Sequence, residues 1–227
     1  MSAISEVKLN IGAGKTRIPG FINIDIAERA ELSLDIGTTP LPFEDSSVDL
    51  IFSYHTMEHV PNYLFALSEI YRVLKHGGIF LVGLPYVTLT EYHLINPYHL
   101  HNFSEHSFAF FEPRQLKGSA AETNDISFVR VFHRFHYIGI FKLLPPPFRT
   151  WCRRHLLNVV RKVDMGLIAF KGTREMGRMI LDSHKLQKQF DKCVRARIPY
   201  EGRLDARPVG GLSIQTIRKA RAWWNGH

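Results

Sequence analysis

The stretch Val7-Lys-Leu-Asn-Ile-Gly-Ala-Gly14, together with Phe21-Ile-Asn-Ile-Asp25, decides the fold of this 227-residue chain. The first stretch is a short apolar run that closes on two glycines. The second alternates apolar and polar residues and ends on an acid. Both patterns are typical of buried strands. Glycines at a strand end let the backbone approach a ligand and offer it N–H groups, although a glycine pair alone often marks only a turn.

Further strands and one helix follow this start at regular spacing. We interpret the apolar runs at residues 32–36, 48–53 and 79–84 as strands. Between residues 60 and 74 the apolar side chains recur with the period of a helix, Pro61 suits its first turn, and residues 75–78 predict its end. Strand, helix and strand at this spacing predict parallel pairing with right-handed crossovers, and therefore an α/β fold.

Two acids, Asp25 and Asp35, stand at the ends of successive predicted strands. The carboxyl ends of parallel strands line the ligand crevice of an open sheet. A carboxylate there can accept hydrogen bonds from both hydroxyls of a ribose, and the second acid could face an adenine amino group. The alternative is that both residues are caps or turn formers. Two acids after a glycine turn favour the nucleoside site.

An ordered set of further motifs accompanies these acids. It consists of Leu9–Gly14, Gly20–Asp25, Leu41–Phe43, Ser46–Ile51, Ser53–His59 and Glu69–Gly78. Over residues 7–112 the chain resembles the class I S-adenosylmethionine-dependent methyltransferases, in the type 11-like small-molecule branch. The resemblance implies a Rossmann-like, doubly wound, mostly parallel sheet with helices on both faces. It also implies S-adenosylmethionine over the glycine turn, with Asp25 on the ribose and Asp35 near the adenine.

From this resemblance we assign a set of residues to the cofactor site: Asn10, Gly12, Ala13, Gly14, Asp25, Ile26, Asp35, Ile36 and Tyr54. The chain departs from the family pattern because Asn10 replaces the usual acid and a third glycine is absent. Only ten residues separate Gly14 from Asp25, too few for a full helix plus a strand. This shortened form resembles methyltransferases encoded with surface-polysaccharide genes. A site for NAD is the alternative on the glycines alone.

The segment His55-Thr-Met-Glu-His59 matches a metalloprotease signature when it is carried on a helix. We predict that it holds no metal, because His55 directly follows a buried strand and no third ligand stands out. A magnesium site is the alternative, since some ubiquinone-pathway O-methyltransferases, which the chain resembles here, bind a cation through Glu-His. They carry an acid where His55 stands.

A second group of histidines lies after the strand at 79–84, in Tyr92-His-Leu-Ile-Asn-Pro-Tyr-His-Leu-His101. A hydroxyl acceptor needs a base, and an imidazole suits that role near neutral pH. We therefore predict His59, His99 and His101 as catalytic residues. The residues predicted to bind the acceptor are His55, Glu58, Tyr92 and Tyr98. The alternative is a loop whose histidines bond backbone carbonyls.

The charge is divided unevenly along the chain. Residues 1–139 carry 10 basic and 15 acidic side chains, and residues 140–227 carry 19 basic and 6 acidic, for a net charge of +8. Residues 148–163 read as one basic amphipathic helix that could contact an anionic membrane, or pack on the sheet as an ordinary helix. We also expect strands at 129–141 and 165–171 and a final helix at 212–224. A basic half can track nucleic-acid phosphates as well.

These patterns lead to one expected organisation and function. With 45% hydrophobic and 22% charged residues, wholesale disorder is excluded. We expect a methyltransferase domain at residues 1–172 and a basic extension at 173–227 packed on or flanking it. The expected reaction is O-methylation of a sugar or a lipid-linked glycan. The alternative is an RNA-directed methyltransferase or nucleic-acid-binding module. Two cysteines, and no signal peptide or apolar run of spanning length, predict a cytoplasmic protein, with a second expectation of peripheral attachment at the inner membrane face.

Overall fold

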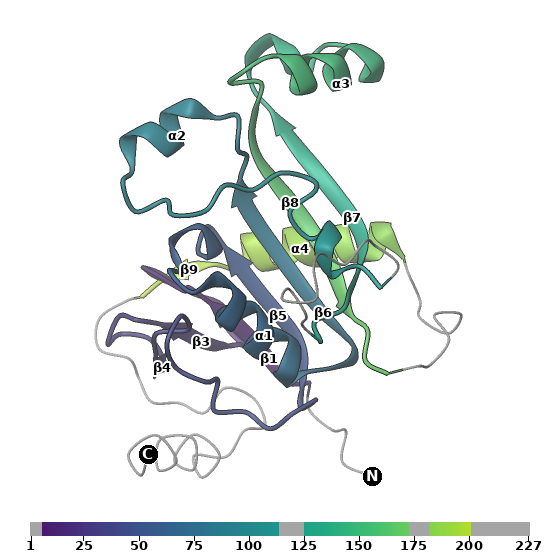
Figure 1. Ribbon diagram of the computed structural model, residues 1–227. Coiled ribbons are helices and arrows are strands. Elements are labelled where there is room, and N and C mark those ends of the chain that lie inside the picture. The colour runs from purple at the N-terminus through teal and green to yellow at the C-terminus, as the bar shows by residue number, and fades with distance from the viewer. Residues whose placement is uncertain (1–5, 114–124, 173–181, 201–227) are drawn as a thin grey trace.

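The computed structural model describes residues 6–113, 125–172 and 182–200. A seven-stranded sheet forms its centre, in the order β4-β3-β1-β5-β6-β8-β7 (Figure 1). Its strands are β1 (Lys8–Ile11), β3 (Ile22–Asp25), β4 (Leu32–Ser33), β5 (Val48–Tyr54), β6 (Leu74–Pro85), β7 (Phe128–Tyr137) and β8 (Val160–Ala169). The short strands β2 (Thr16–Arg17) and β9 (Ile198–Pro199) pair separately.

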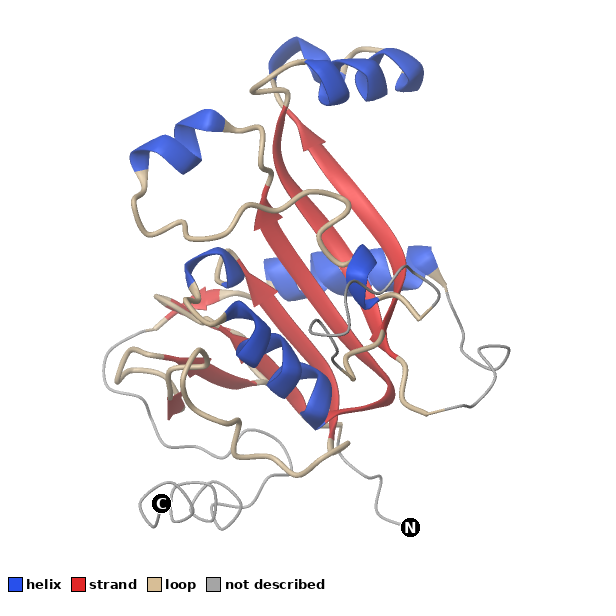
Figure 2. Ribbon diagram, viewed as in Figure 1, coloured by secondary structure: helices blue, strands red, loops and turns tan. Residues whose placement is uncertain are grey.

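The sheet is mostly parallel, as the sequence predicts. β1 pairs in parallel with both β3 and β5, and β5 pairs in parallel with β6. Only β8 runs antiparallel to its two neighbours, β6 and β7. Among the described residues no helix lies between β1 and β3, which confirms that the first connection is too short for one. The carboxyl ends of the parallel strands therefore share one edge, which Figure 2 shows at the top of the sheet.

Helices cover the two faces of the sheet. The helix α1 (Tyr63–Val73) packs on one face and α4 (Ser183–Arg195) on the other (Figure 2). Asn62 caps α1, because its side chain accepts a hydrogen bond from the Phe65 N–H. The predicted bounds of 60–74 were slightly wrong. Pro61 precedes the cap instead of lying in the first turn, and residues 75–78 already belong to β6.

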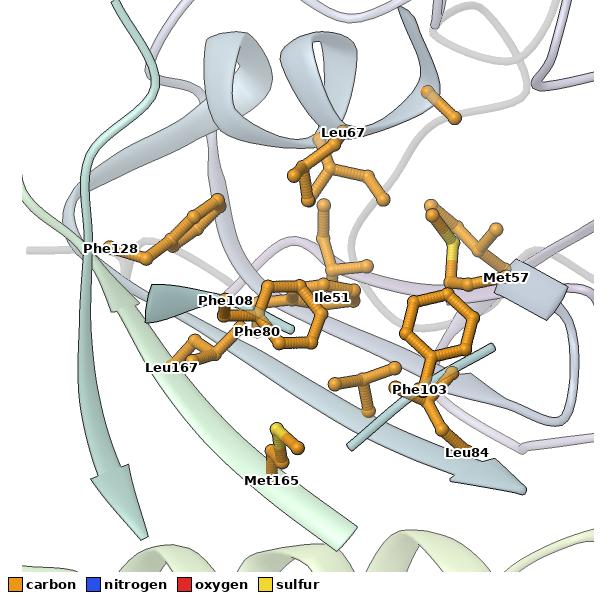
Figure 3. Close-up of a cluster of buried hydrophobic side chains, with 14 of the residues drawn as sticks. Ile51, Met57, Leu67, Phe80, Leu84, Phe103, Phe108, Phe128, Met165 and Leu167 are labelled. Carbon is orange, nitrogen blue, oxygen red and sulfur yellow. The ribbon is translucent and has the colours of Figure 1, made fainter. Parts of the chain in front are cut away.

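Alternation along the central strands divides the core between these faces. In β5, Ile51 packs into the cluster under α1 and Phe52 into the cluster under α4. The larger cluster includes Phe80, Phe108 and Phe128, which Figure 3 shows gathered between α1 and the sheet. The strands are apolar on both faces because helices bury both.

Helix α4 comes from the part of the chain that we assigned to an extension. Its apolar side, with Leu186 and Phe190, is buried against the sheet, and Asp182 caps its first turn by accepting from the Lys185 N–H. Residues 183–195 thus complete the second layer of the fold. The predicted boundary at residue 172 stays a prediction, and the predicted helix at 212–224 lies outside the described residues.

The prediction of one helix over residues 148–163 was wrong. The helix α3 spans only Pro146–His155, and β8 begins at Val160. Asn158 between them takes a φ of 57°, which breaks the helical path. The β-branched residues that follow suit a strand, and here they fill the gap between β6 and β7. The apolar side chains of residues 159–163 therefore pack in the sheet and not along one face of a helix.

Other element bounds also differ from the prediction. The third strand, expected at 32–36, is limited to Leu32–Ser33, because Asp35 turns the chain by accepting a hydrogen bond from the Gly37 N–H. The expected strands at 129–141 and 165–171 are β7 and β8 with shifted ends. A short helix, α2 (Thr90–Ile95), follows β6. In the described part of the chain no helix has the length and apolar character needed to cross a bilayer.

Candidate active site

The turn after β1 requires glycine at one position and leaves room at another. Gly12 has a φ of 73°, and a Cβ on it would lie 1.9 Å from the Thr56 Oγ1. Gly14 has a φ of 61°, and a Cβ there would meet nothing within 4 Å. Both torsions favour glycine. The backbone at Gly12 is thus packed from behind, while the space over Gly14 is open to a ligand.

Asp25 connects this turn to the end of β3. Its carboxylate accepts hydrogen bonds from the Gly14 N–H at 2.7 Å and from the Ala27 N–H at 2.9 Å. Each carboxylate oxygen has a second lone pair, so both can also accept from hydroxyls of a ribose. Ile26 beside it is 73% exposed and offers an apolar surface to a planar base. The turn and the acid therefore fit the nucleoside part of S-adenosylmethionine.

Most of the remaining predicted cofactor residues are buried or half-buried around the turn. Asn10 is buried below the turn, where its amide donates to the Asn23 Oδ1 at 2.8 Å. Ala13 and Ile36 are buried as well. Asp35 is half-buried and holds the Gly37 N–H. Their contacts with the cofactor stay predictions.

Tyr54, also assigned to the cofactor, ends β5 on the α4 side of the sheet. Cations lie over its ring: the Lys162 Nζ is 4.8 Å and the Arg197 Cζ 4.9 Å from the ring centroid. Its contact with the cofactor stays a prediction too.

The segment after β5 changes direction at His55. His55 has a φ of 54°, its N–H donates to the Gly83 carbonyl, and its Nδ1 lies 3.2 Å from the Glu58 Oε1. His59 lies in a short 3-10 turn, Met57–His59, so the two imidazoles are not carried on one helix. This geometry supports our rejection of a metalloprotease site. Glu58 is fully buried although it carries a carboxyl group.

The loop of residues 96–101 docks on this segment through backbone hydrogen bonds. The N–H groups of Leu100 and His101 both donate to the Glu58 carbonyl, at 2.8 and 3.3 Å. The His59 Nδ1 lies 2.9 Å from the Tyr98 carbonyl oxygen, and its ring centroid lies 4.7 Å from that of His99. Because a carbonyl only accepts, Nδ1 carries the proton in that bond, and Nε2 of a neutral His59 keeps its lone pair. Two of the predicted catalytic histidines thus meet.

The environment of His99 favours its neutral form. Burial lowers the pKa of His99, and the positive charge that His59 can carry lowers it further, against an opposite effect of Glu58. A neutral imidazole at pH 7 can accept a proton from an acceptor hydroxyl. The His59–His99 pair therefore has the chemistry expected of a base at the carboxyl edge.

The third predicted catalytic histidine is turned away from this pair. The His101 Nε2 donates to the Val60 carbonyl at 2.8 Å, and its ring packs near Tyr63. The His93 Nε2 likewise lies 3.3 Å from the Tyr86 carbonyl oxygen. The alternative of histidines that bond backbone carbonyls thus describes these two residues.

Some of the predicted acceptor-binding residues lie near the His59–His99 pair and others do not. Tyr98 is 74% exposed at the loop tip, while His55 and Glu58 lie beside the histidine pair. Tyr92 belongs to α2, and its side chain lies outside the described atoms.

Thr56 was missed by sequence reasoning, although it packs behind the glycine turn. Its position directly after a strand was the available signal.

Glu58, His59 and His99 also form a set with metal-ligand chemistry. One ligand-type atom from each lies within 4.8 Å of the others. Two imidazoles and one carboxylate can hold a divalent cation. The sequence did not reveal His99 as a third ligand, since it lies 40 residues beyond His59.

We expect methyl transfer to proceed without a metal, in keeping with the sequence prediction. The measurement is the rate after dialysis against EDTA, and again after addition of Mg²⁺, Mn²⁺ or Zn²⁺. Unchanged rates are expected. A rate that is lost on chelation and restored by one cation would contradict the prediction and assign these residues as ligands. Loss of that restoration in His99→Gln would confirm the assignment.

The strand order, the glycine turn and the acid at the end of β3 together define a Rossmann-like class I methyltransferase fold. A SAM-dependent methyltransferase from Archaeoglobus fulgidus shares this fold, with a TM-score of 0.52 and 16% identity over 73% of this chain and 86% of that one. Residues 24–82 match the family model described as a methyltransferase domain. Residues 24–82 are therefore similar to a methyltransferase domain, and the sheet around them has the class I methyltransferase fold.

Curated relatives are similar over parts of the chain. A 24-methylenesterol C-methyltransferase of Oryza sativa is 26% identical over 152 residues, 63% of this chain and 40% of that protein. A demethylmenaquinone methyltransferase of Staphylococcus haemolyticus is 37% identical over 75 residues, 33% of this chain and 28% of that protein. The chain thus covers less than half the length of these relatives.

Proposed function

We propose that this protein transfers a methyl group from S-adenosylmethionine to a hydroxyl of a small acceptor, a sugar or a lipid-linked glycan intermediate. The observation that carries the proposal is the hydrogen bond from the Gly14 N–H to the Asp25 carboxylate. This bond joins the glycine turn to the acid expected on the ribose, so that both can contact the same nucleoside. The His59–His99 pair supports an oxygen acceptor, because a hydroxyl must lose a proton.

The cofactor brings a methyl group on a sulfonium, which is already an activated leaving group. The protein's contribution is positioning, which can supply about 7–11 kcal/mol of the barrier in well-oriented reactions. Asp25 and the turn hold the nucleoside end. His99, with His59 beside it, takes the proton from the acceptor oxygen.

The names of two relatives bear on the class of acceptor. One acts on a methylenesterol and the other on demethylmenaquinone. Both names describe apolar acceptors, which supports a lipid-linked acceptor over a free sugar. The shortened glycine turn resembles the polysaccharide-cluster enzymes and supports the glycan part.

Calorimetric titration of the full chain tests the cofactor. We expect micromolar binding of S-adenosylmethionine and S-adenosylhomocysteine and none of NAD. Binding of NAD alone, or of none of the three, would overturn the proposal.

The histidine pair is tested with two matched variants. We expect His99→Gln to lower kcat at least a hundredfold in an assay of S-adenosylhomocysteine release, because general bases contribute about 10²–10⁴ in rate. The affinity for S-adenosylmethionine should not change. His101→Gln is the control, since a glutamine amide can still donate to the Val60 carbonyl. Equal losses in the two variants would remove His99 as the base.

A further inference from the structure

Exposed apolar side chains gather on two segments of this protein. Among the described residues fourteen large apolar side chains are exposed, and ten of them lie in residues 94–100 and 140–157. They are Leu94, Ile95, Tyr98, Leu100, Ile140, Leu143, Phe148, Trp151, Leu156 and Leu157, with Leu94 82% and Leu143 83% exposed. Single exposed apolar residues are ordinary, but a gathered set indicates a binding surface. We call this set the edge surface.

The two segments project from the same edge of the sheet. Figure 1 shows α2 and α3 beyond the carboxyl ends of β6 and β7. Asn158, which follows α3, ties them together: its Oδ1 accepts from the Thr90 N–H at 2.8 Å and its N–H donates to the Thr88 carbonyl. The edge surface is therefore held in one place instead of being spread over two independent loops.

The part of the chain that carries α3 has charge of one sign. Residues 138–163 contain six lysines and arginines and no acid. Arg153 and Lys162 are buried and paired with Glu105 and Asp164. The outward cations are Lys142, Arg149, Arg154 and Arg161.

A surface pocket lies among these cations. It has a volume of about 340 Å³, and Lys142, Arg149 and Arg161 are among its lining residues. Such a pocket has the size and the charge to receive a phosphate group.

We propose that the edge surface binds an anionic phospholipid bilayer, with its apolar side chains inserted among the acyl chains and its cations on the headgroup phosphates. A second copy of the chain fits less well, because a two-fold interface would bring these like charges together. RNA fits less well too, since seven of the ten apolar residues are leucine or isoleucine, which cannot stack on bases.

This arrangement would place the active site at the bilayer surface. His99 lies between Tyr98 and Leu100, two residues of the edge surface. A lipid-linked acceptor could then reach the histidine pair without leaving the membrane. This consequence rests on the proposed function, whereas bilayer binding itself does not.

Vesicle flotation with the full chain tests the inference. We expect binding to vesicles of equal parts phosphatidylglycerol and phosphatidylcholine, none to phosphatidylcholine alone, and weakening by salt. The double variant Leu143→Ser, Trp151→Ser should bind at least tenfold more weakly. Arg154→Gln should bind about fivefold more weakly, as expected for one cation at an anionic surface. Leu64→Ser, an exposed apolar residue on α1, is the matched control and should bind as the parent does.

Several outcomes would overturn the inference. They are absence of binding to anionic vesicles, equal binding to neutral ones, or equal loss in the Leu64 control. Concentration-dependent dimers lost in the double variant, without vesicle binding, would assign the surface to a second copy. Salt-dependent binding of RNA without vesicle binding would assign it to nucleic acid. A protein that binds vesicles but not S-adenosylmethionine would refute the proposed function alone.

Discussion

Replacement of Asp164 by alanine is expected to lower the free energy of unfolding by about 3–5 kcal/mol, the cost of leaving buried charges unpaired. Asp164 is fully buried in β8, and its carboxylate accepts from Arg134 at 2.9 Å, His136 at 2.5 Å and Lys162 at 2.8 Å. Lys162 is itself buried, so the variant would leave it without its partner. Urea denaturation followed by circular dichroism measures the loss.

The same group predicts a dependence of stability on pH. Burial alone would raise the pKa of Asp164, but the hydrogen bond from His136 and the charge of Lys162 lower it below its ordinary value. A carboxyl with a lowered pKa in the folded protein stabilises it above the unfolded pKa, about 3.9. That contribution is lost as pH falls below this value through the folded pKa. The free energy of unfolding should therefore fall less steeply with decreasing pH in Asp164→Asn than in the parent protein.

Asp45→Ala is the matched control for this network. Asp45 also pairs with an arginine, Arg72, but its side chain is 76% exposed, and surface pairs contribute less than about 1 kcal/mol. A loss in Asp164→Ala as small as that in Asp45→Ala would show that the buried network does not hold β7 and β8 together.

Replacement of Asp25 by alanine is expected to weaken S-adenosylmethionine binding at least tenfold while the fold stays intact. The variant removes the carboxylate expected on the ribose and also releases the Gly14 N–H that it holds at 2.7 Å. A tenfold loss corresponds to about 1.4 kcal/mol, a modest value for charge-assisted hydrogen bonds. Calorimetric titration measures the affinity, and thermal unfolding checks the fold.

Glu28→Ala provides the control, since Glu28 is an exposed acid three residues further along. Its loss changes the net charge equally but removes no group from the turn. If Asp25→Ala binds S-adenosylmethionine as the Glu28 variant does, the assignment of the ribose contact is wrong.

The prediction of element bounds failed where two periodicities overlap. Residues 159–163 present apolar side chains at helical spacing, yet β-branched residues there also suit a strand. The space between β6 and β7 resolves the ambiguity in favour of β8, which no local pattern could show.

The sequence by itself determined the glycine turn, the strands around it and the parallel pairing. These features depend on chemistry within a few residues: the φ that Gly12 and Gly14 adopt, the apolar runs, and the acid that ends β3. They could be read before any contact was known.

Only the tertiary structure decided which side chains meet across long separations. It pairs His59 with His99 and turns His101 toward the Val60 carbonyl, although both loop histidines look alike in sequence. It also brings α4 onto the second face of the sheet and gathers the apolar residues of two distant segments at one edge. The physical reason is that such meetings depend on the packing of segments tens of residues apart, which local periodicity does not encode.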